Sequence, residues 1–389
     1  MSKEELGSRD HIEANAAVAH QEGVRQQIRE RVSSPQPWEQ PVSFDLSSED
    51  DASVVSELID RGDVGEVRDE VELVAGELFE LYHPGVEQHP GNSVYDEFME
   101  TVLGGDTDYG EWFYFPWGGE LVRYPTVGHL RELRTSRNKD LINSREQDRL
   151  YDSTVAIFGL SVGNNVAESL LSSGVGGRFI IADMDIIEPT NLNRIRADYT
   201  DIGDTKVDYL AKRISKIDPY IDQIHLNDGV NEEVLDGPLA QERPDVIFDE
   251  VDDLAAKIAL RRYAQREGIP VIMATDVGEK SLIDIERYDL GEVEMFNGRM
   301  SPQDIERVAR GDIGKRELGA FILEKFVGHE NVTERLMQSL MQVGDTLPGW
   351  PQLGGAATVG GAISAKAAKD ILLEDGEPRV MSGRRVIDL

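Results

Sequence analysis

The spacing of apolar residues changes at about residue 150. From there, short apolar runs alternate with longer stretches in which apolar side chains recur every three or four positions. The short runs are typical of buried strands, and the longer spacing is typical of helices with one buried face. This alternation predicts an α/β fold with a doubly wound, mostly parallel sheet. The expected strands are 154–158, 178–183, 221–226, 245–249 and 270–274, and the expected helices are 164–173, 204–216 and 254–266.

The remainder of the chain divides by composition. An acidic accessory region follows a polar N-terminal arm, and we expect it to be mainly helical, with a helix over 69–81 and two short strands in the aromatic stretch 112–124. After the α/β region, residues 354–373 are expected to begin as a glycine-rich turn and to continue as a helix. The predicted divisions are 1–40 (polar arm, with a helix over 14–32), 41–125 (accessory region), 126–300 (α/β domain) and 301–389 (a C-terminal helical region that completes the fold).

Charge excludes some classes of partner. The formal net charge is −34, which argues against a nucleic-acid binder and against a binder of anionic membranes. Lysine is scarce, with 11 residues against 29 arginines, and the acids are spread along the whole chain. We interpret this as the acidic, solvated surface of a halophilic, haloarchaeal-type protein, so that the charge reflects the solvent and not the substrate.

The location of the protein is predicted from what its sequence lacks. The N-terminus has no apolar segment of the kind found in signal peptides, and no run of about 18 apolar residues occurs. A soluble, cytoplasmic protein is expected. There is also no cysteine, which excludes thiolate nucleophiles, persulfides and cysteine-based zinc sites in this chain.

A glycine-rich segment joins the first expected strand to the first expected helix. Its sequence is Gly159-Leu160-Ser161-Val162-Gly163. Three interpretations remain open for it alone. The glycines favour close approach of an anion to backbone N–H groups, a GxSxG turn favours Ser161 as a hydrolase nucleophile, and a tight turn needs glycine for purely structural reasons.

The next ordered set of polar residues favours a triphosphate. Asp183 ends the second strand, where an acid suits a ribose. An NAD site has that acid too, but a combination of arginine and lysine after it suits phosphate oxygens. Acids at the end of the fourth strand are placed to hold Mg²⁺ through oxygen. The set comprises Asp185, Asn191, Arg194 and Lys206, and then Asp249, Glu250, Asp252 and Asp253.

This ordered set resembles the ThiF-type superfamily, which includes MoeB, ThiF and the activating domains for ubiquitin-like proteins. The resemblance covers roughly residues 126–300 and implies a Rossmann-like nucleotide-binding domain. It also implies binding of Mg²⁺·ATP and adenylation of a carboxylate, with release of pyrophosphate. The acceptor implied is the C-terminus of a small ubiquitin-like or sulfur-carrier protein, or a peptide, and the assembly implied is a homodimer.

The resemblance assigns roles residue by residue. Arg134 and Arg137 resemble the family's arginines that precede the domain, of which one reaches the γ-phosphate from the partner subunit, and we expect Arg137 to be that residue. Arg194, Lys206 and Asp252 complete the expected catalytic set. By position, Gly159, Ser161 and Gly163 would border the phosphates, Asp183 would bind the ribose, Asp185, Asn191, Arg194 and Lys206 would complete the nucleotide site, and Asp252 would hold the metal.

Departures from the family pattern narrow the function. The glycine loop is one residue shorter than the usual GxGGxG, Ile195 stands where a glutamine often follows the arginine, and Asp253 stands where an asparagine often follows the metal-binding aspartate. Without cysteine, a thioester, a ThiF-like persulfide and the family's CxxC zinc pair are impossible, so adenylation alone remains. Residues 131–142 and 159–163 also resemble a subgroup that is sometimes fused to a nitroreductase-like domain, but no flavin module is evident in this chain.

Three alternatives stay open. A catalytically degenerate ATP-binding protein is favoured by the short loop, a GxSxG serine hydrolase would recruit His329 and Asp249 to Ser161, and an NAD-dependent oxidoreductase would use the same glycine loop and acid.

Overall fold

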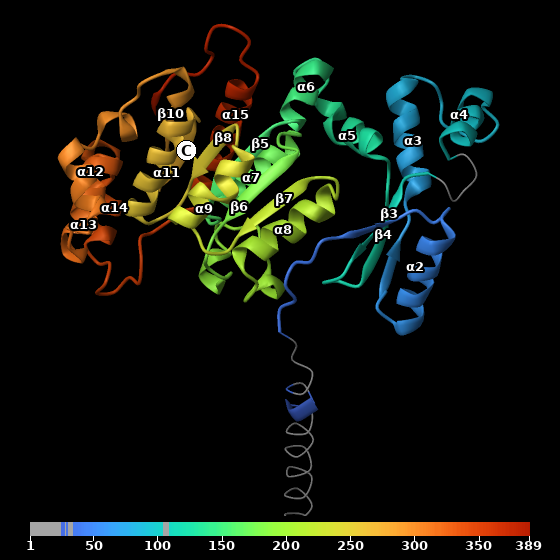
Figure 1. Cartoon of the computed structure of the whole chain (residues 1–389), viewed down its shortest axis with the longest axis horizontal. Helices are drawn as coiled ribbons and strands as arrows, with labels where there is room; N and C mark the ends of the chain where they lie inside the picture. Colours follow the sequence, from blue (N-terminus) through green and yellow to red (C-terminus); the bar gives the residue numbers. More distant parts are fainter. Residues whose placement is uncertain (1–24, 28, 30–33, 104–108) are drawn as a thin grey trace, which may run out of the picture. The chain divides into compact units, whose positions relative to one another are not determined.

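Five parallel strands and two antiparallel strands form a seven-stranded sheet in the computed structural model of the chain (Figure 1). The structure describes residues 25–27, 29, 34–103 and 109–389, and the account below concerns Pro37–Leu389, which forms one compact unit. Most of the helix predicted over 14–32 lies outside the described residues. Of the predicted polar arm, 1–40, only the part from Pro37 onwards belongs to the compact unit.

The strand order of the large sheet is β11-β10-β9-β8-β5-β6-β7. The five predicted strands are all present, and they run parallel to one another. Two antiparallel strands that the sequence did not predict extend one edge. The strands are β5 (Thr154–Phe158), β6 (Arg178–Ala182), β7 (Asp222–Leu226), β8 (Val246–Asp249), β9 (Val271–Val277), β10 (Lys280–Glu286) and β11 (Gly383–Asp388).

Helices cover both faces of this sheet. They do so because the strand residues that point to one face and those that point to the other are both apolar. On one face, Val155 and Ile157 of β5 pack with residues of α7, α8 and α15, and on the other, Ala156 and Phe158 pack with residues of α9, α10 and α11. The doubly wound α/β fold predicted from the sequence is confirmed. The helices are α7 (Val162–Ser172), α8 (Lys206–Ile217), α9 (Glu232–Asp236), α10 (Pro238–Glu242), α11 (Leu254–Glu267) and α15 (Gly354–Leu372).

One local prediction was wrong. Residues 354–373 do not begin as a glycine-rich turn, because α15 is helical from Gly354. The glycines instead allow close helix packing. A Cβ atom on Gly361 would lie 2.7 Å from the Cβ of Asn165 in α7, which is closer than side chains tolerate. The small residues therefore let α15 lie directly against α7.

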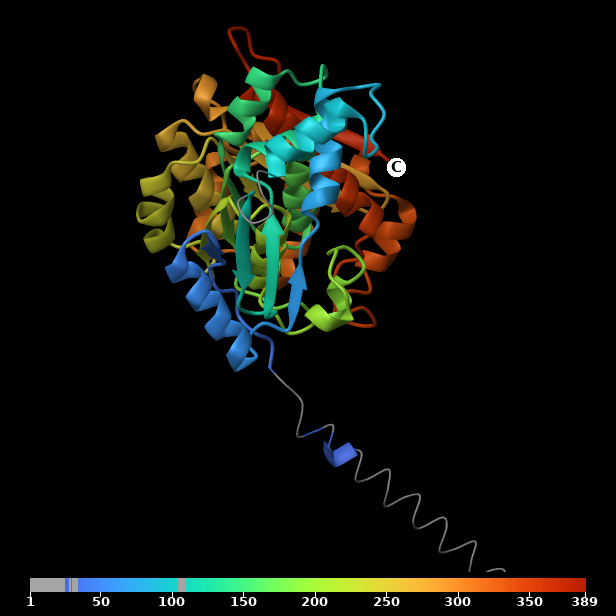
Figure 2. The same cartoon turned by 90° about the vertical axis from the view of Figure 1, so that its right-hand side faces the viewer.

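The accessory region contains the expected helices and, in addition, a small sheet of order β1-β3-β4-β2. Its strands β3 and β4 run side by side in teal in Figure 2 and correspond to the two strands expected in the aromatic stretch. Trp38 links this part to the large sheet, since its ring meets that of His225 of β7 edge-on at 4.2 Å. The elements are β1 (Val42–Phe44), α2 (Glu49–Arg61), β2 (Glu66–Arg68), α3 (Val71–Tyr82), α4 (Ser93–Leu103), β3 (Glu111–Phe115) and β4 (Glu120–Tyr124).

Shorter elements complete the unit. Helices α5 (Val127–Thr135), η1 (Ser136–Asn138) and α6 (Ser144–Tyr151) precede β5. Most of the segment between β10 and α15 is helical, as expected: α12 (Pro302–Ala309), α13 (Lys315–Phe321), the π-helix η6 (Ile322–Val327), η7 (His329–Asn331) and α14 (Glu334–Leu340). The remaining turns are η2 (Pro189–Asn191), η3 (Tyr199–Asp201), η4 (Tyr288–Leu290) and η5 (Met295–Gly298). Within the described ranges, no helix combines the length and the apolar character that crossing a bilayer requires.

Candidate functional site

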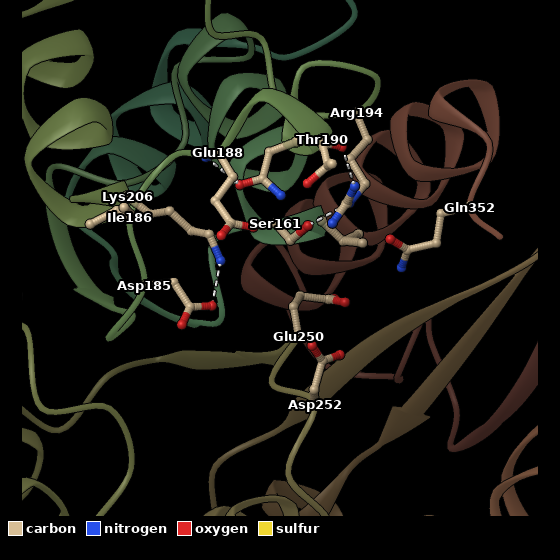
Figure 3. A pocket seen from close by; sticks show the side chains of 12 residues that line it. Ser161, Asp185, Ile186, Glu188, Thr190, Arg194, Lys206, Glu250, Asp252 and Gln352 are labelled. Atoms are coloured by element: carbon tan, nitrogen blue, oxygen red, sulfur yellow. Dashed lines mark hydrogen bonds and ion pairs between the residues drawn. The ribbon is translucent and has the colours of Figure 1, made fainter. Parts of the chain in front are cut away.

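A pocket of about 310 Å³ lies at the carboxyl ends of β5, β6 and β8. The chain proceeds from β5 to β6 and β7 on one side and returns to β8 on the other, so the sheet changes direction at β5. Ligands of doubly wound sheets bind at such a switch point. The pocket is lined by Ser161, Val162, Asp185, Ile186, Glu188, Thr190, Asn191, Arg194, Lys206, Glu250, Asp252 and Gln352 (Figure 3).

Lys206 supplies one of the two positive charges of the pocket. It is the first residue of α8, and its side chain is only 8% exposed. Its Nζ atom lies 2.8 Å from Asp185 Oδ2 and 3.5 Å from Asp183 Oδ2. The two carboxylates fix the ammonium group at the pocket wall, because a buried amine must be paired to stay charged.

Arg194 supplies the other charge. Its Nε atom donates a 2.7 Å hydrogen bond to Ser161 Oγ, and one terminal nitrogen donates to the carbonyl oxygen of Thr190 and to Asn193 Oδ1. Asn165 Nδ2 donates to the Arg194 carbonyl oxygen at 2.8 Å and so anchors its backbone to α7. The guanidinium is thereby held beside the first turn of α7, where backbone N–H groups also favour anions.

The glycine loop is shaped by its neighbours. Gly159 has a φ of +86°, and a Cβ atom there would lie 2.3 Å from the carbonyl oxygen of Glu250, so only glycine fits. Gly163 lies in the first turn of α7 against Ile157. Asp183 accepts hydrogen bonds from the backbone N–H groups of Leu160 and Asp185, at 2.6 Å and 2.8 Å. The carboxylate of Asp183 therefore orders the loop in this structure.

Carboxylates form the opposite side of the pocket. Asp252 is exposed and Glu250 is buried, and both follow β8 directly. Burial raises the pKa of Glu250 well above its usual value, although the Ala274 N–H group and Lys257 oppose the rise. Asp249 differs: burial acts to raise its pKa, but Lys257 and the fully buried Arg261 outweigh it and hold that pKa below its usual value. Asp249 therefore forms buried ion pairs with Lys257 and Arg261 in the core of the domain.

The structure brings most of the expected site residues together. Six of them line the pocket: Ser161, Asp185, Asn191, Arg194, Lys206 and Asp252. Three others do not line the pocket and instead contact the loop or strands next to it: Gly159, Gly163 and Asp183. Arg137 is exposed in η1 and lies outside the lining. Arg134 forms an ion pair with the buried Asp218 and donates to the Leu171 carbonyl oxygen at 2.8 Å, so it anchors α5 to the domain.

Glu188 and Gln352 line the pocket but were not singled out from the sequence, whereas Glu250 was named there without an expectation of its burial. Glu250 lies in the acidic run after β8, which contained the signal for it, although not its burial. Glu188 precedes η2 and could have been found by its proximity to Asn191 in sequence. Gln352 comes from the segment before α15, and its carbonyl oxygen accepts a 3.0 Å hydrogen bond from Asn193 Nδ2. No sequence signal links residues 159 positions apart.

Comparison with known proteins agrees with this architecture. Over 286 residues the chain is 35% identical to an uncharacterised protein of Mycobacterium tuberculosis, a match that covers 72% of this chain and 38% of that protein. It is 32% identical over 160 residues to the tRNA threonylcarbamoyladenosine dehydratase of Bacillus subtilis, covering 41% and 61% respectively. The sulfur carrier protein ThiS adenylyltransferase of Escherichia coli is 31% identical over 134 residues, covering 34% and 52%. The chain therefore spans less than two thirds of each of these relatives.

A solved structure and a family model were also matched. The crystal structure of the Escherichia coli tRNA N6-threonylcarbamoyladenosine dehydratase is 19% identical, with a TM-score of 0.45 over 62% of this chain and 95% of that one. The matching family model is that of the ThiF family, over residues 135–284, which include the strands from β5 to β8. Residues 135–284 of this chain are therefore similar in sequence to the ThiF family.

Proposed function

We propose that this protein catalyses the Mg²⁺·ATP-dependent adenylation of a carboxylate. The observation that carries the proposal is the convergence of Arg194 and Lys206 on one pocket, beside the first turn of α7 and opposite Asp252. Two cations and a helix N-terminus suit a triphosphate, and an open carboxylate suits the metal that accompanies it. The ThiS adenylyltransferase among the relatives carries the same activity class in its name.

The chemistry needs no nucleophile from the protein. One oxygen of the acceptor carboxylate attacks the α-phosphorus of ATP, the bond from that phosphorus to the bridging oxygen breaks, and pyrophosphate leaves with the electron pair. Negative charge then accumulates on the phosphate oxygens. Arg194 and Lys206 are already fixed by their partners, so they stabilise this charge without reorganisation, which is the most effective kind of electrostatic catalysis. Orientation of the two substrates supplies a further part of the rate.

Asp252 is the residue that fits the metal. It is exposed in the pocket, whereas its neighbour Asp253 caps α11 by accepting a hydrogen bond from the Ala256 N–H group. Among the described residues there is no group of three or more acidic or histidine side chains that would hold a metal by itself. Mg²⁺ is commonly bound by one or two carboxylates together with substrate phosphates, and this donor set matches that case. When bound, the ion neutralises developing phosphate charge.

The acceptor and the assembly follow from the same resemblance. We assign the acceptor to the C-terminus of a small ubiquitin-like or sulfur-carrier protein or of a peptide, and no cysteine of this chain takes part. Arg137 is exposed and outside the pocket, so it reaches the triphosphate only from a second copy. A homodimer in which each Arg137 completes the partner's site is therefore part of the proposal.

The environment of Ser161 argues against the serine hydrolase alternative. The hydroxyl oxygen of Ser161 accepts its hydrogen bond from Arg194, which cannot act as a base. No histidine is among the described residues that line the pocket, and Asp249 is bound to Lys257 and Arg261. A serine nucleophile here would have no histidine as its general base among the described lining residues.

Calorimetric titration of Mg²⁺·ATP in multimolar KCl tests the nucleotide site, with NAD as the competitor. We expect ATP to bind, NAD to fail to compete, and Asp252→Ala to weaken the Mg²⁺·ATP complex. Absence of ATP binding by folded protein would overturn the proposal. ATP binding without pyrophosphate release, in the presence of carrier proteins and peptides encoded by the same organism, would support a degenerate ATP-binding protein instead.

A further inference from the structure

The guanidinium group of Arg194 is held by hydrogen bonds that leave one of its nitrogen atoms unused. Arginine carries five N–H groups in one plane, one on Nε and two on each terminal nitrogen. Nε donates to Ser161 Oγ at 2.7 Å, and Nη1 donates to the Thr190 carbonyl oxygen at 3.1 Å and to Asn193 Oδ1 at 3.0 Å. Within the described part of the chain, no hydrogen bond or ion pair uses Nη2. Because Arg194 lines the pocket, the two N–H groups of Nη2 are the ones left for a ligand.

The side-chain amide of Asn193 connects this guanidinium group to a distant part of the chain. Its Oδ1 atom accepts from Arg194, and its Nδ2 atom donates a 3.0 Å hydrogen bond to the carbonyl oxygen of Gln352, 159 residues away. An arginine side chain can only donate and a carbonyl oxygen can only accept, so the connection needs an acceptor and a donor on one side chain. An amide supplies both, and asparagine is the shortest side chain that carries an amide. Asn193 is exposed, so these two hydrogen bonds and not burial orient its side chain.

The main chain makes a second contact at the same place. A Cβ atom on Gly354, the first residue of α15, would lie 2.0 Å from the main-chain carbonyl oxygen of Asn193. Only glycine permits this approach, so the start of α15 lies directly against the loop that carries Arg194. In Figure 3, Arg194 and Gln352 stand at the same end of the pocket. One side-chain contact and one main-chain contact therefore join this loop to residues 352–354.

A fixed orientation of Arg194 favours binding of an anion. A long side chain loses rotamer freedom when a ligand orders it, and Arg194 is already ordered by its own partners. Because the guanidinium group is planar, the partners of Nη1 also determine where Nη2 points. Of the two Nη1 partners, the Thr190 oxygen belongs to the main chain, whereas Asn193 acts through its side chain. Asn193 is therefore the Nη1 partner that a substitution can remove.

We infer that Asn193 is a positioning residue for the triphosphate. On the proposed function, on which this inference rests, Asn193 lies outside the pocket lining and acts through Arg194. It holds the Nη2 edge of Arg194 in the direction of the phosphates and connects that orientation to the start of α15. The carbonyl oxygen of Gln352 thereby takes part in nucleotide recognition, although it is bonded to Asn193 and not to the nucleotide.

A double-mutant cycle on the full chain tests this without the acceptor. Dissociation constants for Mg²⁺·ATP and for AMP are measured by calorimetry in multimolar KCl, and their ratio isolates contacts to the β- and γ-phosphates. We expect Asn193→Ala to reduce the preference for ATP about 10-fold, as loss of a hydrogen bond to a charged group does. Asn193→Leu, which keeps the bulk of the amide without its polar atoms, should do the same. In an Arg194→Ala background, Asn193→Ala should change the preference by less than about 2-fold, because the side chain that it orients is absent.

Asn92→Ala is the matched control. The side-chain amide of Asn92 also connects two groups, since it accepts from the Val94 N–H group at 3.1 Å and donates to the Glu87 carbonyl oxygen at 3.0 Å, but it lies in the accessory region. The control should keep the wild-type preference for ATP. A wild-type preference in folded Asn193→Ala, or an equal loss of preference with and without Arg194, overturns this inference alone. Failure of the wild-type protein to bind ATP overturns the proposed function with it.

Discussion

The Nε atom of Arg194 and the hydroxyl oxygen of Ser161 are joined by a hydrogen bond of 2.7 Å across 33 residues of sequence. This bond links the loop after β5 to the loop after η2, which are separated along the chain by β6. It also uses the hydroxyl of the residue that precedes α7, so Ser161 does not cap the helix with its side chain. The first backbone N–H groups of α7 therefore remain available beside the guanidinium of Arg194.

Replacing Arg194 should weaken ATP binding and adenylation while the fold persists, because its side chain bonds only loop groups and Ser161. We expect Arg194→Ala to lower adenylation about 100-fold, as removal of one preorganised donor generally does. Arg194→Lys should recover only part of this loss, since lysine lacks the planar, five-donor fork of arginine. Pyrophosphate release and calorimetric ATP affinity measure the two effects. An Arg194→Ala protein as active as wild type would contradict the assignment.

Asp252→Asn should change the dependence on Mg²⁺ more than the stability. The side chain is exposed, so the urea midpoint is expected to stay within the error of the wild-type value. The Mg²⁺ concentration needed for half-maximal ATP binding should rise about 10-fold, because amide oxygen is a weaker ligand than carboxylate. Asp253→Asn is the matched control, since asparagine keeps the cap of α11. Equal Mg²⁺ dependence in both variants would remove Asp252 from the metal site.

Gly159→Ala should be strongly destabilising. A methyl group there would meet the Glu250 carbonyl oxygen at 2.3 Å, in addition to the strain of a φ of +86°. Gly268→Ala is the control, because Gly268 has a φ of +64° at the end of α11 but no atom closer than 3.8 Å. The control should lose about 1–2 kcal/mol for its backbone conformation alone. Urea denaturation should show a clearly larger loss for Gly159→Ala, and similar losses in the two variants would show that the loop relaxes freely.

His225 should make the protein less stable in mild acid. Burial lowers its pKa from 6.5 to about 4, with the neighbouring Asp208 opposing the shift, and Trp38 and Gln223 contact the ring. The unfolded chain therefore binds the proton first as pH falls. The contribution of neutral His225 is complete above pH 6.5 and is lost progressively between pH 6.5 and 4.

His225→Gln isolates this effect from the many carboxylates of the chain. Its free energy of unfolding should fall less than that of the wild type between these pH values, by about 1–2 kcal/mol once partial exposure of the ring is allowed for. Urea denaturation at a series of pH values in constant high salt measures the difference. Parallel pH profiles for the two proteins would show that His225 is protonated in the folded state as easily as in the unfolded one.

The sequence by itself determined the parallel core and the order of the site residues. The five predicted strands were found because buried parallel strands are continuous apolar runs, and the polar residues that end them meet at one edge by topology. Asp185, Asn191, Arg194, Lys206 and Asp252 reach a common pocket for that reason. Strand β10 was missed because it forms a hairpin with β9 outside the βαβ alternation, and β11 was missed because it pairs with β10 through contacts about 100 residues apart.

Only the tertiary structure decided which polar groups form ion pairs and hydrogen bonds within the protein and which remain available to a ligand. Arg134 has the type of side chain expected in a nucleotide site, but Asp218 pairs with it. Asp183 accepts one backbone N–H group on each oxygen and keeps further acceptor positions. Gln352 gave no such signal, yet it lines the pocket. Burial and pairing depend on neighbours that are distant in sequence, and local pattern carries no information on them. The close packing of α15 on α7 decided, for the same reason, that a glycine-rich segment is a helix.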